Sequence, residues 1–461
     1  MIRSIRQRFP VALLVTTAAF IIYLLTLAPD LTWANFGVDG GELITAAVTL
    51  GVPHPPGYPL YVLAGKVISY LPVGSIAYRF NLFSAVTVAL AAGFVTAAAS
   101  HLLASSEHKA AAVAGGLSFA LMPLVWSQAL IAEVYGLNLA FSAALVWALL
   151  VRRPPWQVGL LLGLAVTSHL TSLLLLPLTL GLTPYRSWYR LGLGCALGLA
   201  PLLALPFLAQ TGSPVIWGEP ATFSGWWWLV SGRLYHANLL ALPLPELWTR
   251  LQTWLWLIPA QFLWVGLLFI LVGLIQSRAS LARPAYWFLG TAALYLLYAA
   301  GYATEDAIVL LMPGLMLLSL LLAIGLHRLG WIVLLLPLLL LLLNFNTQRL
   351  NDGHSVRPLA EAVLQVMPPD AILLTPGDPT IFTLWYFQHV EGRRPDLVLV
   401  DTNLFAFTWY RQRLQDQYPN LSGFERDDLE IFRRLNQAKR PVCRATVATG
   451  LIDYSCSMDS S

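Results

Sequence analysis

Residues 11–27 read VALLVTTAAFIIYLLTL, an uncharged run almost long enough to cross the hydrocarbon core of a membrane as a helix. Residues 308–326 and 331–343 form two further runs of this kind. The 461-residue chain is 57% hydrophobic and 11% charged, whereas about a quarter of the residues in an ordinary soluble domain are charged. The sequence therefore predicts an integral membrane protein whose fold is mainly α-helical.

The basic residues before the first apolar run indicate its orientation. Arg3, Arg6 and Arg8 precede it, as in a secretory signal peptide, but only Ala28-Pro29-Asp30 follows it, with no small-residue cleavage site. We therefore expect an uncleaved helix with a cytoplasmic N-terminus, since basic residues favour the cytoplasmic side.

About 11 spanning helices follow from the apolar runs and from the basic residues in the loops between them. They are expected over residues 11–28, 82–104, 110–128, 134–151, 156–168, 170–183, 191–209 and 250–275, and then as three helices ending near 301, 327 and 344. Ser105–Lys109 is expected to be a cytoplasmic loop, and Leu60–Leu71 an interfacial helix. This topology places the 29–79, 210–247 and 301–307 loops on the extracytoplasmic side, together with everything after about residue 345.

The composition becomes that of a soluble domain near residue 351, so we divide the chain into a transmembrane domain, 1–346, and an extracytoplasmic α/β domain, 347–461. Strands at 371–375 and 396–401 around a helix at 380–390 form a βαβ pattern with parallel strands. Helices are expected at 407–417 and 427–437, and a frayed polar tail from Asp453. Cys443 and Cys456 are either a disulfide or two free thiols.

Two segments of the first outer loop contain candidate active-site residues. Asp39 and Glu42 lie three residues apart among glycines, where a carboxylate can act as a general base for a hydroxyl or bind a metal. The alternative is a helix cap, with Asp39 as the N-cap residue. His54 lies in Pro53-His54-Pro55-Pro56-Gly57-Tyr58-Pro59, where prolines stiffen the chain. It could contact a phosphate or an acceptor, or be solvated in a rigid turn.

Other ionisable residues cluster near the predicted outer membrane surface. Glu133 and His169 are candidates because ionisable groups at membrane depth are often functional. Arg233 and His236, three residues apart, suit a lipid phosphate. Glu133 could instead be a carboxylate that stabilises a helix start, as could Glu305 and Asp306. His169 could be a hydrogen-bonded core histidine. Arg233 and His236 could contact bulk lipid headgroups.

Several of these segments resemble the transmembrane protein 260 family. The most specific are Asp39-Gly40-Gly41-Glu42-Leu43, Pro53–Leu60 and Arg79-Phe80-Asn81-Leu82-Phe83-Ser84. The resemblance extends to Trp126-Ser127-Gln128, Glu133-Val134-Tyr135, Ser168-His169-Leu170-Thr171, Ser213-Pro214 with Trp217-Gly218-Glu219-Pro220, Gly377-Asp378-Pro379 and Gly392-Arg393-Arg394-Pro395-Asp396.

The resemblance implies a GT-C glycosyltransferase fold and an inverting transfer of a hexose, mannose in the animal member, from a polyprenyl phosphate to a protein Ser or Thr hydroxyl. It implies that Asp39 is the catalytic base, with Glu42 as a second acid. The leaving phosphate needs cations, for which Arg233, His236, His54 and His169 are the candidates. The expected substrate-binding set is completed by Tyr58, Arg79, Glu133, Tyr135 and Asp306.

Other functions stay open on the sequence. The same donor could serve a glycolipid or an envelope polysaccharide, and the soluble part is shorter than in the animal members. A lipid or solute transporter would show inverted repeats, which we do not find. A structural scaffold would not need the acids and His54 in one loop.

The sequence contains no dinucleotide or P-loop motif. It requires no cofactor, is compatible with a divalent metal, and indicates no nucleic-acid partner. The expected location is a prokaryotic plasma membrane, with membrane lipids and a protein or glycan acceptor as partners.

Overall fold

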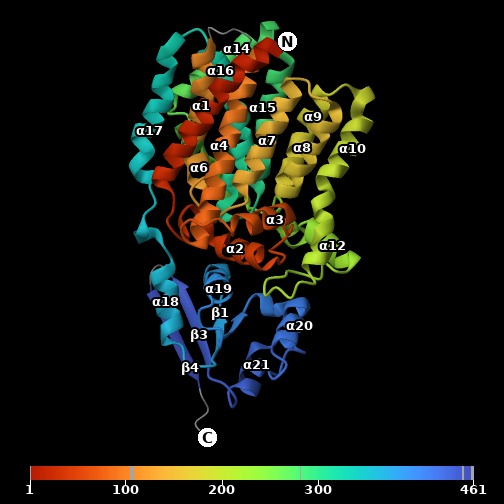
Figure 1. Ribbon diagram of the computed structural model, residues 1–461, viewed down its shortest axis with the longest axis vertical. Coiled ribbons are helices and arrows are strands. Elements are labelled where there is room, and N and C mark those ends of the chain that lie inside the picture. The colour runs from red at the N-terminus through yellow and green to blue at the C-terminus, as the bar shows by residue number, and fades with distance from the viewer. Residues whose placement is uncertain (1, 104–107, 281, 449–450, 458–461) are drawn as a thin grey trace.

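The computed structural model describes residues 2–103, 108–280, 282–448 and 451–457. It has a helical body, with the N-terminus at its far end, and a smaller α/β domain at the opposite end (Figure 1). Most of the expected loop Ser105–Lys109 lies outside the described residues. Between the body and the α/β domain lies a layer that contains the two short helices α2 and α3 (Figure 1).

The helices of the body follow the apolar runs of the sequence. They are α1 Ile2–Thr26, α2 Gly40–Thr49, α3 Pro59–Ile68, α4 Ile76–Leu103, α5 Lys109–Leu121, α6 Pro123–Gln128, α7 Tyr135–Leu150, α8 Pro155–Ser168, α9 Leu176–Leu182, α10 Trp188–Leu199, α11 Leu205–Leu208, α12 Phe223–Val230, α13 Leu244–Ala260, α14 Val265–Ser280, α15 Ala282–Gly301, α16 Met312–Leu326 and α17 Leu335–Gln348.

Four continuous helical segments of the described chain are long and apolar enough to cross a membrane, or five if one bent pair forms a single span. They comprise residues 76–103, 185–208, 305–326 and 330–348. Six shorter apolar helices accompany them, including α8 and the 170–182 segment, so the expected helical pair at 156–183 is present with short halves.

Two expected spans are not continuous helices. The 110–128 helix breaks at Met122, whose ψ of 130° is extended, because the following Pro123 disfavours a helical residue before it. The prediction of one continuous helix over 250–275 is wrong, because α13 and α14 meet at a bend of 82°. The break falls at Leu263 and Trp264, whose φ values of +52° and +59° no α-helix accommodates.

The C-terminal domain contains a four-stranded sheet in the order β2-β1-β3-β4. Its strands are β1 Ile372–Thr375, β2 Val398–Asp401, β3 Val442–Ala448 and β4 Leu451–Ser457, and its helices are α18 Arg357–Val366, α19 Asp378–Trp385, α20 Thr408–Gln417 and α21 Leu429–Asn436. β1 pairs in parallel with both β2 and β3, which confirms the expected βαβ unit.

The expected frayed tail from Asp453 is wrong through Ser457. Residues 451–457 form β4, which pairs antiparallel with β3. Backbone ladder bonds hold this segment whatever the polarity of its side chains. Cys443 lies opposite Cys456 in the ladder, and the two form a disulfide.

The outer-loop layer and the C-terminal domain share one hydrophobic core. Buried Leu43 of α2 and Tyr61 of α3 belong to the same cluster as Phe382 of α19 and Ile372 of β1. The C-terminal domain is thus packed onto the segment 29–79, where the candidate catalytic residues lie.

Candidate active site

Asp39 and Glu42 lie at the start of α2. A 3-10 turn, Ala34–Asp39, leads directly into this helix. Glu42 is completely buried, whereas 38% of the Asp39 side chain is exposed. The helix-cap alternative is wrong, because Asp39 makes no cap hydrogen bond with the described α2 backbone and Glu42 is engaged elsewhere. The two carboxylates therefore have different environments.

His54 lies between these two carboxylates. Its Nδ1 is 2.5 Å from Glu42 Oε2, its backbone N–H donates to Glu42 Oε1 at 3.1 Å, and its Nε2 is 3.8 Å from Asp39 Oδ2. His54 is 8% exposed, so the alternative of a solvated histidine is wrong. The order Glu42–His54–Asp39 leads from the buried helix turn to the more open carboxylate.

The local sequence explains why His54 is held in this position. Val52 donates to Val215 O at 2.8 Å and accepts from Trp217 N at 2.9 Å, which joins the first outer loop to the second. Gly57 has φ of +88°, and a Cβ there would lie 2.8 Å from a methyl carbon of Leu229, so only glycine fits. The proline segment is thereby fixed at both ends.

Mutual electrostatics shift the pKa values of these groups. Burial by itself lowers the pKa of His54, but Glu42 and Asp39 outweigh it and raise the value to about 10. Loss of hydration raises the pKa of Asp39 to about 6, with contributions from Glu42 and Asp306 and an opposing effect of His54. Burial likewise raises the pKa of Glu42. Near pH 7 the site therefore holds an imidazolium beside an ionised Asp39.

A group of aromatic and polar side chains lies on the body side of His54. The ring of Tyr58 is 5.2 Å from that of His54 and 6.3 Å from that of His169. Tyr135 is 5.4 Å from His169, and its hydroxyl is 3.1 Å from Asp306 Oδ2. The structure thus brings together expected residues from four separate segments.

Glu133 is part of the same surroundings. It is 4% exposed, and its Oε2 accepts a hydrogen bond from its neighbour Val134 at 3.3 Å. Burial and the nearby Asp39 raise the pKa of Glu133 well above its usual value. It is therefore suited to be a neutral hydrogen-bonding group near the site.

Three of the expected residues lie elsewhere or face solvent. Arg79 donates to the carbonyls of Ser69, Val73 and Gly74, which ties the end of α3 to the start of α4. Arg233 and His236 are on the 3-10 turn Arg233–Asn238, and both are exposed. His236 Nε2 lies 3.0 Å from Ser231 O. Tyr235, between them, is the residue of this turn whose ring reaches His54, at 6.3 Å.

Residues that sequence reasoning did not select also reach the site. Trp217 lies 6.2 Å from His54 and Tyr235 lies 6.3 Å from it, both measured between ring centroids. Asp378, at the first turn of α19, is coupled electrostatically to Asp39 and Glu42. One signal could have found Asp378: it lies three residues after the carboxyl end of parallel strand β1, where ligands of α/β domains bind.

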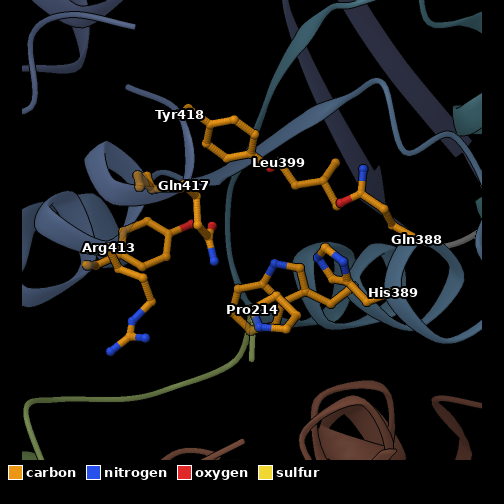
Figure 2. A pocket seen from close by; sticks show the side chains of 10 residues that line it. Pro214, Gln388, His389, Leu399, Arg413, Gln417 and Tyr418 are labelled. Atoms are coloured by element: carbon orange, nitrogen blue, oxygen red, sulfur yellow. The ribbon is translucent and has the colours of Figure 1, made fainter. Parts of the chain in front are cut away.

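A separate small cavity lies in the C-terminal domain. Pro214 of the second outer loop and residues of the domain, among them Gln388 and Arg413, line it (Figure 2). Gln388 Oε1 and Arg413 Nε are buried without a hydrogen-bond partner in the described part of the chain. Its volume of about 20 Å³ accommodates one water molecule and no sugar. Among the described residues no group of three or more His, Cys, Asp or Glu is arranged to hold a metal ion.

Comparisons with known proteins match both parts of the chain. The family model described as the N-terminal domain of protein O-mannosyl-transferase TMEM260 matches residues 39–192, and TMEM260-associated domain 2 matches residues 356–423. Protein O-mannosyl-transferase TMEM260 of Mus musculus is 29% identical over 91% of this chain and 66% of its own length. The Dictyostelium discoideum protein of that name is 31% identical over 28% of this chain and 15% of its own.

A solved structure of another membrane protein has a similar fold. The crystal structure of ArnT from Cupriavidus metallidurans bound to undecaprenyl phosphate superposes with a TM-score of 0.58 and 15% identity, covering 97% of this chain and 98% of that one. The fold is therefore of the GT-C class, and the protein is an integral membrane protein with several spans.

The chain is thus similar to the TMEM260-like family in two regions, residues 39–192 and 356–423. It spans just under two thirds of the length of the mouse relative.

Proposed function

We propose that the protein is an inverting, lipid-phosphate-sugar-dependent glycosyltransferase. It would move a hexose, with mannose as the first choice, from a polyprenyl phosphate to a hydroxyl, most simply that of a protein Ser or Thr. The observation that supports this best is the Glu42–His54–Asp39 arrangement, with distances of 2.5 and 3.8 Å. The names of the relatives and the GT-C fold agree with this proposal.

Asp39 is the base in this mechanism. Its side chain is the more open of the two carboxylates, and its pKa of about 6 leaves it ionised yet more basic than an ordinary aspartate. It accepts the proton of the acceptor hydroxyl while the hydroxyl oxygen attacks the sugar C1 from the face opposite the phosphate. The C1–O bond to the phosphate breaks, and the configuration at C1 is inverted.

Glu42 and His54 position this base. The Glu42 carboxylate holds the imidazole through Nδ1 and through the backbone N–H, so that Nε2 faces Asp39. The imidazolium favours the ionised form of Asp39. In our proposal Glu42 acts on the base and does not touch the substrate.

The leaving phosphate develops negative charge that cations and hydrogen-bond donors must stabilise. His169 and the hydroxyls of Tyr58 and Tyr135 lie on the body side of His54, from which a lipid would approach. Arg233 is exposed on the second outer loop and makes no ion pair with a described residue. We propose Arg233 as a mobile cation for the phosphate, with His236 beside it; Arg79 is the weaker candidate, because backbone carbonyls occupy its guanidinium.

We propose an extracytoplasmic active site in a prokaryotic plasma membrane, with the N-terminus inside. The basic residues Arg3, Arg6 and Arg8 at the start of α1 support this orientation. The 1–346 part would then perform the chemistry and the 347–461 part would form its aqueous face.

Transfer from a synthetic polyprenyl-phosphate hexose to Ser- and Thr-containing peptides, measured with purified protein, tests the proposal. Asp39→Asn should lower the transfer rate by about 10²–10⁴-fold, as expected for loss of a general base. Glu219→Gln, an exposed carboxylate in the second outer loop, is the matched control and should retain activity. Full transfer by Asp39→Asn would exclude it as the base, and flux of lipid or solute through liposomes without any transfer would favour a transporter.

A further inference from the structure

We infer that the C-terminal domain forms the acceptor side of the active site, and that Asp378 selects peptide acceptors by their charge. This inference rests on the proposed transferase function. It assigns a role to a residue of the soluble domain, which lies more than 300 positions after Asp39 in the sequence.

The contact between α19 and α2 is close enough to fix Asp378 relative to Asp39. A Cβ at Gly41 would lie 2.4 Å from Phe382 O, so the backbones of the two helices touch. The Trp33 indole N–H donates to Thr383 Oγ1 at 3.0 Å on the same contact. Trp33 precedes the 3-10 turn Ala34–Asp39 and Gly41 lies in the first turn of α2, so the two contacts flank Asp39 in the sequence.

Asp378 lies on the face of α19 that meets the outer loops. It is four residues before Phe382, and residues spaced by four share one face of a helix. The Phe382 ring is 6.4 Å from Trp217, whose own ring is 6.2 Å from His54. Trp217 is 5% exposed, and its indole nitrogen has no hydrogen-bond partner among the described residues.

Asp378 is open to water, unlike most groups around His54. Its side chain is exposed, as is that of Asn403, which follows β2. Asn403 Nδ2 would lie 3.9 Å from a Cβ at Gly377, so Asp378 and Asn403 flank the carboxyl ends of neighbouring parallel strands. Tyr58, Tyr135 and His169 occupy the opposite, body side of His54. A water-soluble acceptor therefore approaches Asp39 past Asp378, whereas a lipid-linked glycan would arrive from the bilayer.

The charge of this region determines which peptides it accepts. The carboxyl groups of Asp39, Glu42, Glu133 and Asp378 interact electrostatically with His54, and that of Asp306 interacts with Asp39. His54 is the cation that balances them, and Asp378 is the acid on the aqueous side. A basic residue next to the acceptor Ser or Thr is attracted to Asp378 and an acidic one is repelled.

The test compares two peptides that differ only in a Lys or a Glu beside one Ser, with full-length protein and a polyprenyl-phosphate mannose donor. We expect the wild type to show a lower KM for the Lys peptide by about 3- to 10-fold, as a partly screened charge pair gives. Asp378→Asn should abolish most of that preference while kcat at saturating peptide stays within about threefold, since the base is untouched. Asp427→Asn, an exposed acid of the same domain, should retain the preference.

Binding of polyprenyl phosphate and thermal unfolding are measured on every variant. Unchanged donor binding with a lost charge preference supports the inference, and Asp378→Ser repeats the test if Asp378→Asn unfolds. An unchanged preference in both variants overturns it, as does transfer confined to lipid-linked glycans. If the wild type transfers sugar to nothing, the proposed function fails, and this outcome is distinct from failure of the Asp378 assignment.

Discussion

His54 Nδ1 lies 2.5 Å from Glu42 Oε2, and Glu42 has no exposed surface. A buried carboxylate is costly unless a cation and hydrogen bonds compensate it. The imidazole and the backbone N–H of His54 supply both, since each donates to one oxygen of the same carboxylate. The pair thus fixes the proline segment on α2 and directs Nε2 toward Asp39.

The pair predicts a bell-shaped pH profile for transfer. Asp39 must be ionised, so the rate should rise through pH about 6. His54 loses its positive charge only as the pH passes about 10. The transfer rate should therefore stay constant between pH about 6 and about 10. The pH dependence of kcat/KM for the acceptor measures both limbs.

Glu42→Gln should narrow this pH profile from its basic side. Because Glu42 raises the pKa of His54, its loss moves the basic limb to lower pH. The acidic limb is subject to two opposing changes, because Glu42 itself raises the pKa of Asp39 and a neutral His54 would no longer lower it, so the test rests on the basic limb. A profile identical to that of the wild type would contradict the positioning role; Glu219→Gln, on the exposed loop, is the control.

Arg357 joins the two parts of the chain and should stabilise their contact. Its Nε donates to Asp30 Oδ2 at 2.6 Å, and its terminal nitrogens bind Glu391 at 2.6 and 2.7 Å. Arg357→Ala should lower the free energy of unfolding by about 1–3 kcal/mol, because charged hydrogen bonds are lost and partners are left partly buried. Denaturation in detergent measures the change.

The matched control for Arg357 is Arg434, which forms an exposed ion pair with Glu430 on α21. Exposed helical pairs contribute about 0.3–0.5 kcal/mol, so Arg434→Ala should have little effect. Equal losses in the two variants would show that Arg357 does not act as a link between domains.

Removal of the disulfide should destabilise the edge of the sheet. Cys443 and Cys456 are 13 residues apart and close a short loop between paired strands. A loop of about 15 residues predicts about 3 kcal/mol of stabilisation. Cys443→Ser should lower the unfolding temperature and increase proteolysis near β4, whereas Cys195→Ser, a free cysteine in α10, should not. Unchanged protease sensitivity in Cys443→Ser would contradict this.

The sequence predicts the features of the fold that depend on composition. It predicts the local arrangement of helices and strands only in part. Apolar runs locate the helices, and alternating strand and helix signals locate the βαβ unit. Neither Leu263 nor Trp264 is a glycine or a proline, so nothing at these two positions predicts the bend. The apolar pattern therefore predicts one continuous helix through it. The polar residues from Asp453 do not predict a strand, because β4 is held by backbone pairing with β3.

The site shows the same division. Asp39, Glu42 and His54 lie 15 residues apart or less and share a loop, so motif and chemistry suffice to select them. Arg233 and His236 were chosen for their charge, but the ring that reaches His54 from that turn belongs to Tyr235. Asp378 joins the site only through the docking of α19 on α2, a long-range contact that spacing in one sequence does not encode.

That docking predicts the effect of a single methyl group at Gly41. A Cβ there would lie 2.4 Å from Phe382 O, and because the obstacle is backbone, a rotamer change cannot relieve it. Gly41→Ala should therefore separate α19 from α2 and lower stability by about 1–3 kcal/mol, although alanine in a helix is intrinsically favourable.

Gly290 of α15 is the matched control, because a Cβ there would meet no atom within 4 Å. Gly290→Ala should be neutral or more stable by up to about 1 kcal/mol, the usual gain in helix propensity. In transfer assays Gly41→Ala should raise the KM for the acceptor more than it changes donor binding. The substitution would displace α19 of the C-terminal domain and leave the helical body intact. If Gly41→Ala matched Gly290→Ala in both stability and KM, the close contact between α2 and α19 would have no part in forming the site.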